Sequence, residues 1–312
     1  MAAIEVEDLQ KSFGTVRALA GISFTVADGE TVAVLGPNGA GKTTAMEILE
    51  GYQRPDGGRA RVLGMDPSTG GSELRQRIGI VLQEAGVDAY LSVREVVTRY
   101  AELYRRPRDV AEVVHLVGLD EKADARAQSL SGGQKRRLDL ALGLVGDPEL
   151  LFLDEPTTGF DPSARRVAWE TIEDLKELGK TILLTTHYMD EAQRLADRIV
   201  VIAGGRIVAD GPPESIGGRE HAAAQITFRL PAGTSSAELP VRAGFESNAV
   251  VRRDGEVVVE TSEPTRVLHV LTEWALERGI ELAGLTVSRP SLEDVYLALT
   301  EEAAAEATGD RG

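Results

Sequence analysis

Between residues 36 and 44 the chain reads Gly36-Pro37-Asn38-Gly39-Ala40-Gly41-Lys42-Thr43-Thr44, which fits the pattern G-x-x-x-x-G-K-[ST]. The apolar run 31–35 before this loop is typical of a buried strand, and residues 44–50 after it are typical of the start of a helix. A glycine-rich loop in this setting can wrap its backbone N–H groups around phosphates, and the helix N-terminus adds a favourable dipole. We therefore expect it to bind a nucleoside triphosphate.

Within this loop we expect the Lys42 ammonium to lie on the outer phosphates and the Thr43 hydroxyl to hold Mg²⁺. The residues expected to contact the nucleotide are Gly36, Asn38, Gly39, Ala40, Gly41, Lys42, Thr43 and Thr44. A glycine-rich turn that merely caps a helix is the alternative. The strand, the full motif and the helix together argue against it.

The composition excludes several other functions. The 312 residues include 34 basic and 50 acidic side chains, for a formal charge of −16, so we expect no nucleic-acid partner. The chain has no cysteine, which excludes disulfides and thiolate chemistry. The N-terminus does not resemble a secretory signal, and no apolar run approaches the ~18 residues that span a bilayer. We expect any membrane-spanning part to come from another chain.

Four apolar runs typical of buried strands end beside chemically useful residues. These are 31–35 before the phosphate loop, 78–82 before Gln83, 150–153 before Asp154 and Glu155, and 181–186 before His187. Aliphatic runs separated by helical stretches indicate a mainly parallel sheet covered on both faces, in which ligands bind beyond the carboxyl ends of the strands. We therefore expect the polar residues at these ends to converge near Lys42.

The residues at the strand ends suit separate roles. Asp154 suits an Mg²⁺ partner, and Glu155, which faces differently, suits a general base or water-orienting group. His187 could donate a hydrogen bond to the γ-phosphate, and Gln83 could contact both the metal and the attacking water. An acidic turn stopped by Pro156 is the structural alternative for the carboxylate pair.

The segment Leu130-Ser131-Gly132-Gly133-Gln134 predicts a second glycine-rich helix start. Ser131 and Gln134 fit a capping box for a helix that runs through Lys135 to about Val145. The same helix end is also an anion site, because its two glycines let a phosphate approach. The chain would then have two phosphate-binding helix ends, of which only the first carries a lysine.

Taken in order, these motifs resemble the nucleotide-binding subunit of an ATP-binding cassette (ABC) transporter. The resemblance covers about residues 4–215 and rests on the phosphate loop, Gln83, the signature at 130–134, the run 150–155, the segment Gly159-Phe160-Asp161, and His187. It implies a P-loop cassette of the α/β class, with a mainly parallel sheet, an antiparallel β subdomain and a helical subdomain.

The resemblance also implies partners and ligands. Two copies would pair head to tail, each holding ATP and Mg²⁺ between its own phosphate loop and Ser131, Gly132, Gly133 and Gln134 of the other copy. Phe13 stands where the family places an aromatic ring on the adenine, although tyrosine is more usual there, and Phe160 replaces a more usual leucine. The subunit would lie at the cytoplasmic face of the membrane, bound to an integral membrane permease.

The remainder, 217–312, follows a turn-rich linker and predicts a small α+β domain after a cassette of residues 1–216. We expect strands at 225–230, 249–252, 256–260 and 281–287, and helices at 265–278 and 291–299, with 301–307 as a fraying helix end. The stretch 289–299 resembles the ending of ATPases of the daunorubicin-resistance type, which favours drug export.

Two alternative functions remain for the chain. A non-transport ABC ATPase would be expected to carry a coiled-coil insertion, zinc-binding cysteines or two cassettes. A regulatory module without hydrolysis would not need Glu155 and His187.

We expect a permease to contact the segment 84–104 through the loop 85–91. The stripe that recurs there at helical spacing is predicted to pack on the cassette: Val93, Val96, Val97, Tyr100 and Leu103.

Overall fold

The structure is a computed structural model that describes residues 2–81, 86–219, 222–231, 234, 239–240, 247–251 and 256–309. Contacts divide the chain into two compact units: Met1–Pro213 with Leu299–Gly312, and Glu214–Ala298. The predicted domain border between residues 216 and 217 stays a prediction. None of the helices in the described part of the chain is both long and apolar enough to cross a bilayer.

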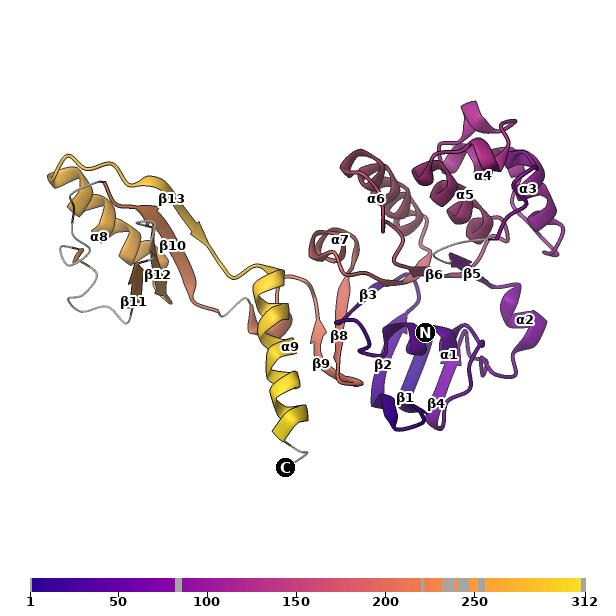
Figure 1. Cartoon of the computed structure of the whole chain (residues 1–312), viewed down its shortest axis with the longest axis horizontal. Helices are drawn as coiled ribbons and strands as arrows, with labels where there is room; N and C mark the ends of the chain where they lie inside the picture. Colours follow the sequence, from indigo (N-terminus) through magenta and orange to yellow (C-terminus); the bar gives the residue numbers. More distant parts are fainter. Residues whose placement is uncertain are drawn as a thin grey trace. The chain divides into compact units, whose positions relative to one another are not determined.

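The first unit is built on a six-stranded sheet in the order β5-β6-β7-β3-β8-β9 (Figure 1). Its strands are β3 (Thr31–Leu35), β5 (Ile78–Val81), β6 (Leu150–Asp154), β7 (Thr181–Thr185), β8 (Arg198–Ala203) and β9 (Arg206–Gly211). All neighbours are parallel except β8 and β9. Every residue of β3 and β7 is buried, as continuous aliphatic runs require in a sheet covered on both faces. The predicted α/β cassette fold is confirmed.

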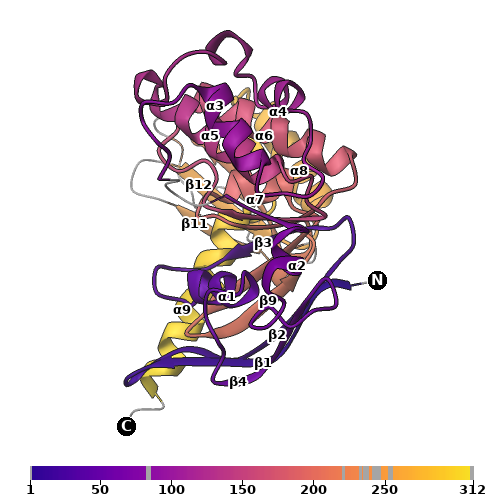
Figure 2. The ribbon, with the colours of Figure 1, turned by 90° about the vertical axis from the view of Figure 1, so that its right-hand side faces the viewer.

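A second, antiparallel sheet packs on the same core. It has the order β2-β1-β4, from Val16–Ala27, Ala2–Phe13 and Gly57–Val62. Helix α1 (Lys42–Leu49) lies against it (Figure 2). The buried side chains of α1 join residues of both sheets in one hydrophobic cluster, which fixes the start of α1 relative to the ends of the parallel strands. The short α2 (Gly71–Arg75) follows β4.

Helices α3 (Val93–Ala101), α4 (Val110–Leu116) and α5 (Gly132–Leu144) gather into a helical subdomain (Figure 1). Two 3₁₀ turns, η1 (Asp120–Lys122) and η2 (Ala127–Ser129), lie between α4 and α5. The predicted packing stripe is confirmed for Val93, Val96 and Val97, which are buried. It is wrong for Leu103, which is 68% exposed because α3 ends before it. Helices α6 (Pro162–Glu177) and α7 (Met189–Leu195) precede β7 and β8 respectively.

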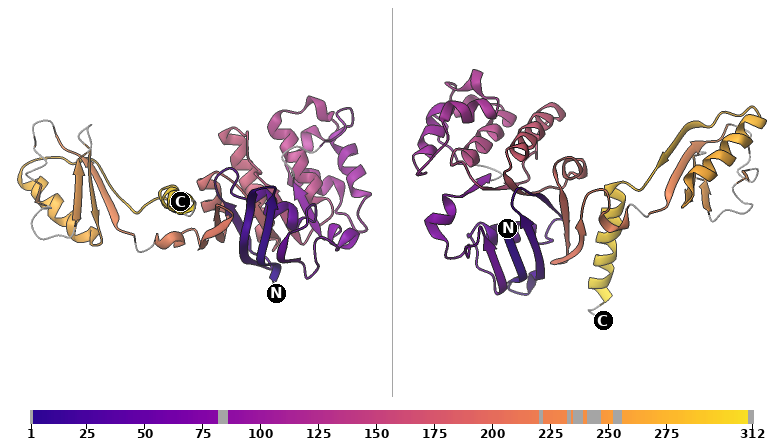
Figure 3. Two further views of the ribbon diagram at one scale, coloured as in Figure 1. Left: turned by 60° about the horizontal axis from the view of Figure 1, so that its bottom comes forward. Right: turned by 180° about the vertical axis from the view of Figure 1, so that it is seen from behind.

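The second unit is a four-stranded antiparallel sheet in the order β11-β12-β10-β13 with helix α8 on one face (Figure 3). Its elements are β10 (Ala224–Arg229), β11 (Ser247–Val251), β12 (Glu256–Thr261), α8 (Pro264–Glu277) and β13 (Ala283–Ser288), after the 3₁₀ turn η3 (Ile216–Gly218). Alternate residues of β10 and β12 pack on Val267, Leu271 and Trp274 of α8. The predicted strands and the helix at 265–278 are present, with ends shifted by at most two residues.

The last helix, α9, runs over Leu292–Gly309. The predicted helix at 291–299 is therefore longer than expected, and the expected helix end at 301–307 is part of it. Residues 301–307 contain only alanine and glutamate, which are both good helix formers, so the helix continues through them.

Candidate active site

The phosphate loop connects β3 to α1. Gly41, the residue before α1, has a left-handed φ of 107°, and a Cβ there would lie 2.4 Å from the Ala18 carbonyl oxygen. A Cβ on Gly36 would lie 2.2 Å from the carbonyl oxygen of Ile202. Both positions therefore require glycine, which lets the loop turn tightly over the strand ends. Residues 37–39 are exposed on its outer side.

Lys42 is the first residue of α1 and is only 8% exposed. Its Nζ donates to the carbonyl oxygens of Gly36 at 2.6 Å and Pro37 at 3.2 Å. Burial lowers the pKa of Lys42, while the carboxylates of Glu155 and Asp154 act in the opposite direction. The loop cation and the two strand-end acids thus share one electrostatic site.

Asp154 and Glu155 lie at the carboxyl end of β6 and have different partners. The Asp154 carboxylate accepts a hydrogen bond from the Thr185 hydroxyl of β7. Glu155 has a left-handed φ of 46°, and its carboxylate accepts from the Thr158 hydroxyl at 3.0 Å. The two carboxylates thus have different hydrogen-bond partners, and the separate roles expected for them stay predictions.

His187 follows β7 and faces Glu155. Its Nδ1 lies 3.5 Å from Oε1 of Glu155. The His187 ring contacts the Tyr188 ring at a centroid distance of 4.0 Å, and the Arg165 guanidinium lies 4.0 Å from the Tyr188 ring centroid. A glutamate and a histidine from neighbouring parallel strands therefore meet beside the phosphate loop.

The second glycine-rich helix end forms the predicted capping box at the start of α5. The backbone N–H of Gln134 donates to the Ser131 hydroxyl at 3.3 Å, and the backbone N–H of Ser131 donates to Oε1 of the Gln134 side chain at 3.0 Å. Gly132 is exposed, and a Cβ there would meet no atom within 4 Å. The helix end is therefore open to a ligand that comes from outside the chain.

Two predicted residues cannot be placed together with the rest. Gln83 lies outside the described residues. Phe13 ends β1 and is 48% exposed, with Lys11 Nζ 5.6 Å from its ring centroid. The exposed ring could stack on a base, and this role stays a prediction.

Sequence reasoning passed over three residues of the site. The Thr185 hydroxyl bonds Asp154 and also accepts from the Glu155 backbone amide at 3.1 Å. The sequence clue to Thr185 would have been a hydroxyl side chain in an otherwise aliphatic strand. Glu50 is buried at the end of α1, and its pKa is raised to about 7, first by burial and then by the charges of Asp154 and Glu47. No motif marks Glu50. Arg136 bonds the backbone after β6.

A strand–loop–helix phosphate site with carboxylates and a histidine at adjacent strand ends defines a P-loop nucleoside triphosphatase. Residues 19–158 match the family described as ABC transporter, and residues 224–291 match the family described as ABC transporter domain-containing protein-like, C-terminal domain. The chain belongs to the ABC transporter family, as an ATP-binding and ATP-hydrolysing member.

Similarity to individual proteins extends over nearly the whole chain. The Nod factor export ATP-binding protein I of Rhizobium sp. (strain N33) is 40% identical over 96% of this chain and 97% of its own length. The daunorubicin/doxorubicin resistance ATP-binding protein DrrA of Streptomyces peucetius is 37% identical over 96% of this chain and 92% of its own length. Among solved structures, cbiO1 from Clostridium perfringens, described as part of the ABC transporter complex cbiONQ, has a TM-score of 0.63 and 32% identity over 68% of this chain and 89% of that chain.

Proposed function

We propose that the chain is the ATPase subunit that powers export of a hydrophobic compound through a separately encoded membrane permease. Support comes from relatives named for Nod factor export and for drug resistance, which are similar over 96% of this chain. In this proposal the subunit is peripheral, at the cytoplasmic face of the membrane, and the permease supplies the spanning segments.

The observation that carries the catalytic proposal is the Glu155–His187 pair, with 3.5 Å between Oε1 and Nδ1, in the electrostatic field shared with Lys42. The loop amides and Lys42 bind the outer phosphates of ATP. Glu155 orients the attacking water and accepts its proton, and His187 donates to the γ-phosphate.

The residues present also suit Mg²⁺, because Thr43, Gln83 and Asp154 offer the oxygen ligands that this hard cation prefers. Asp154 is held by Thr185, and Thr43 is exposed beside Lys42. When bound, Mg²⁺ would neutralise charge on the β- and γ-phosphates.

Two copies of the chain complete each site in this proposal. The open α5 end, with Ser131, Gly132, Gly133 and Gln134, binds the ATP held by the phosphate loop of the other copy. Because both copies keep the same residues, the homodimer has two competent sites.

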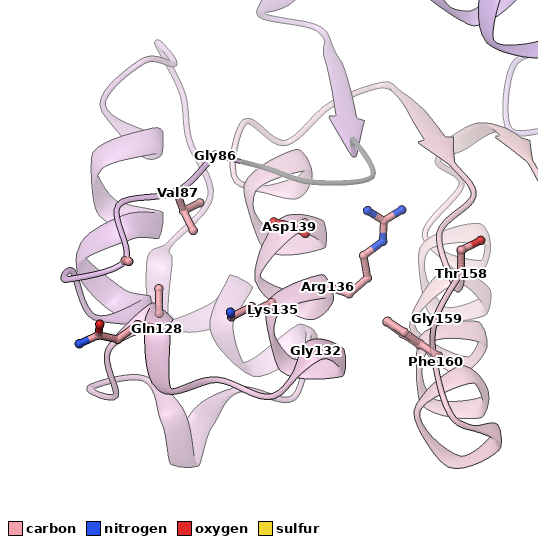
Figure 4. Close-up of a pocket in the computed structure, with 12 residues that line it drawn as sticks. Gly86, Val87, Gln128, Gly132, Lys135, Arg136, Asp139, Thr158, Gly159 and Phe160 are labelled. Carbon is pink, nitrogen blue, oxygen red and sulfur yellow. The ribbon is translucent and has the colours of Figure 1, made fainter.

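The permease docks on the segment 84–104, chiefly on the loop 85–91. The first residues of this segment lie outside the described part. Of the rest, Tyr90 is 73% exposed, and Val87 and Ala89 line a cavity of about 540 Å³ beside α5 (Figure 4). The Ala89 carbonyl accepts from the Gln128 amide at 3.0 Å, which fixes the loop to η2.

Site-directed crosslinking in cells that make the native permease tests the proposal. Since the chain has no native cysteine, single cysteines at Val87, Asp88 and Tyr90 are clean probes. They should link to an integral membrane protein, whereas a cysteine at the exposed Glu277 of α8 should not. Crosslinks from Glu277→Cys alone would place the docking surface in the second unit. No crosslink to a membrane protein from any position would count against a permease partner.

A further inference from the structure

The backbone turn that carries Glu155 is strained. Glu155 is not a glycine, yet its φ of 46° lies in the left-handed region. Its amide donates to the backbone carbonyl of Thr185 at 3.1 Å, which holds one side of the turn. A strained residue keeps its conformation only where its surroundings fix it on several sides. The direction of the Glu155 side chain therefore depends on what holds the remaining groups of this turn.

Arg136 holds the carbonyl side of the same turn. Its Nη2 donates to the carbonyl oxygens of Asp154 at 2.8 Å and Glu155 at 3.0 Å, and its Nε donates to that of Pro156 at 3.1 Å. One planar guanidinium thus bonds three consecutive carbonyl groups. Lysine could not reproduce this, because a single ammonium cannot span the three acceptors.

The Arg136 guanidinium is a buried charge, and its burial has a desolvation cost. Arg136 is only 8% exposed. Burial lowers the pKa of Arg136, and the carboxylates of Asp139, Asp154, Glu191 and Glu155 act in the opposite direction. A buried cation is expensive unless its donors are used, so the three backbone contacts account for its presence. Removing it would leave three carbonyl groups without this donor.

Arg136 also connects the turn to a different part of the fold. It lies on α5, five residues after Ser131 and on the helix that begins at the second glycine-rich end. Figure 4 shows its side chain reaching from α5 toward the chain at Thr158. The next residue of the turn is held from elsewhere: the Thr157 hydroxyl donates to Glu191 of α7 at 2.7 Å. Of these contacts, those of Arg136 link the turn to the helical subdomain.

We propose that Arg136 is a positioning residue for ATP hydrolysis, which fixes the turn 154–156 so that Glu155 faces His187 and which ties this turn to the signature helix α5. The inference rests on the proposed role of Glu155.

The matched test compares Arg136→Gln with Arg137→Gln in the full-length protein. Arg137 is the next residue of α5, and its guanidinium donates to Gly118 inside the helical subdomain at 3.3 Å. Arg136→Gln should lower kcat about 10- to 100-fold, since small misplacements of a catalytic group have effects of this size. Its dissociation constant for ATP should change by less than about twofold. Arg137→Gln should keep kcat within about twofold of the wild type.

Arg136→Lys guards against a variant that fails to fold, because it keeps the charge but loses the fork. It should show a similar loss of kcat with a thermal transition near that of the wild type. A kcat for Arg136→Gln or Arg136→Lys equal to that of Arg137→Gln overturns the inference.

A double-mutant cycle then separates positioning from general damage. Turnover is measured with radiolabelled ATP in single-turnover experiments for Glu155→Gln with and without Arg136→Gln. If Arg136 acts through Glu155, the second change should cost less than about twofold once Glu155 is replaced. If the losses of turnover from Arg136→Gln and Glu155→Gln multiply in the double variant, the inference is overturned. Wild-type turnover in Glu155→Gln alone would instead remove the proposed role of Glu155.

Discussion

Helices α1 and α5 both begin at glycine-rich ends, yet the two ends differ in almost every contact. At α1 the loop is closed over the strand ends, Lys42 is buried, and its ammonium bonds the loop's own carbonyls. At α5 the first residue, Gly132, is exposed, and Ser131 caps the helix with Gln134. The first end thus has its own cation, whereas the second offers amides and a hydroxyl.

The difference indicates a division of labour. A phosphate chain bound at α1 finds Lys42, Glu155 and His187 in the same copy. In the proposed dimer, the α5 end contributes to a site only when the other copy brings the nucleotide to it. In that dimer each copy contributes half of two sites: its α1 end to one and its α5 end to the other.

The largest effect is expected from Glu155→Gln, which should slow ATP hydrolysis without weakening ATP binding. Glu155→Gln should lower kcat by about 10²–10⁴-fold, because loss of a general base has effects of this size. Its affinity for ATP should stay near that of the wild type, since Lys42 and the loop are intact. Steady-state hydrolysis and equilibrium nucleotide binding measure the two quantities. Equal turnover in variant and wild type would remove Glu155 from the mechanism.

Lys42→Ala tests the cation of the α1 end. It should weaken ATP binding by about 10- to 100-fold, as expected for loss of a charge-assisted hydrogen bond to phosphate. Equilibrium titration with a fluorescent nucleotide analogue measures the change. Lys135→Ala is the matched control on α5, because Lys135 is exposed. This variant should leave the affinity of the monomer for ATP unchanged. Comparable losses in both variants would show that the two ends do not differ as described.

A smaller effect is expected from Glu50 at the far end of α1. Its pKa of about 7 lies above the ordinary value of 4.5, so between these pH values the folded protein binds more protons than the unfolded chain. The free energy of unfolding should therefore fall as pH rises through this window. Glu50→Gln should be more stable than the wild type at pH 8 by about 1–3 kcal/mol and much less so at pH 5.

Urea denaturation at both pH values, without nucleotide or Mg²⁺, measures the effect of Glu50→Gln. The control is Glu121→Gln, a change at an exposed position. An identical pH dependence in wild type and Glu50→Gln would show that Glu50 does not hold a proton in the folded state.

The contrast between the helix ends also shows what a sequence can predict. Patterns with a fixed local geometry were sufficient for the phosphate loop, the capping box at Ser131 and the buried strands. Asp154, Glu155 and His187 could be brought together because parallel strands end at one edge. Arg136 and Glu50 could not be found this way, because their importance comes from burial and from contacts distant in sequence. The helix at 291–299 and the helix end at 301–307 were expected as separate pieces, and the structure joins them in α9.

The central claim is that the α5 end completes the site of a second copy. Light scattering of Glu155→Gln tests it directly, with and without ATP, because this variant should bind ATP without turning it over. The account predicts that ATP doubles the mass of Glu155→Gln, and that adding Ser131→Arg abolishes the doubling by placing bulk at the shared site while ATP still binds. A mass that ATP does not change would contradict the claim, as would a dimer that tolerates Ser131→Arg.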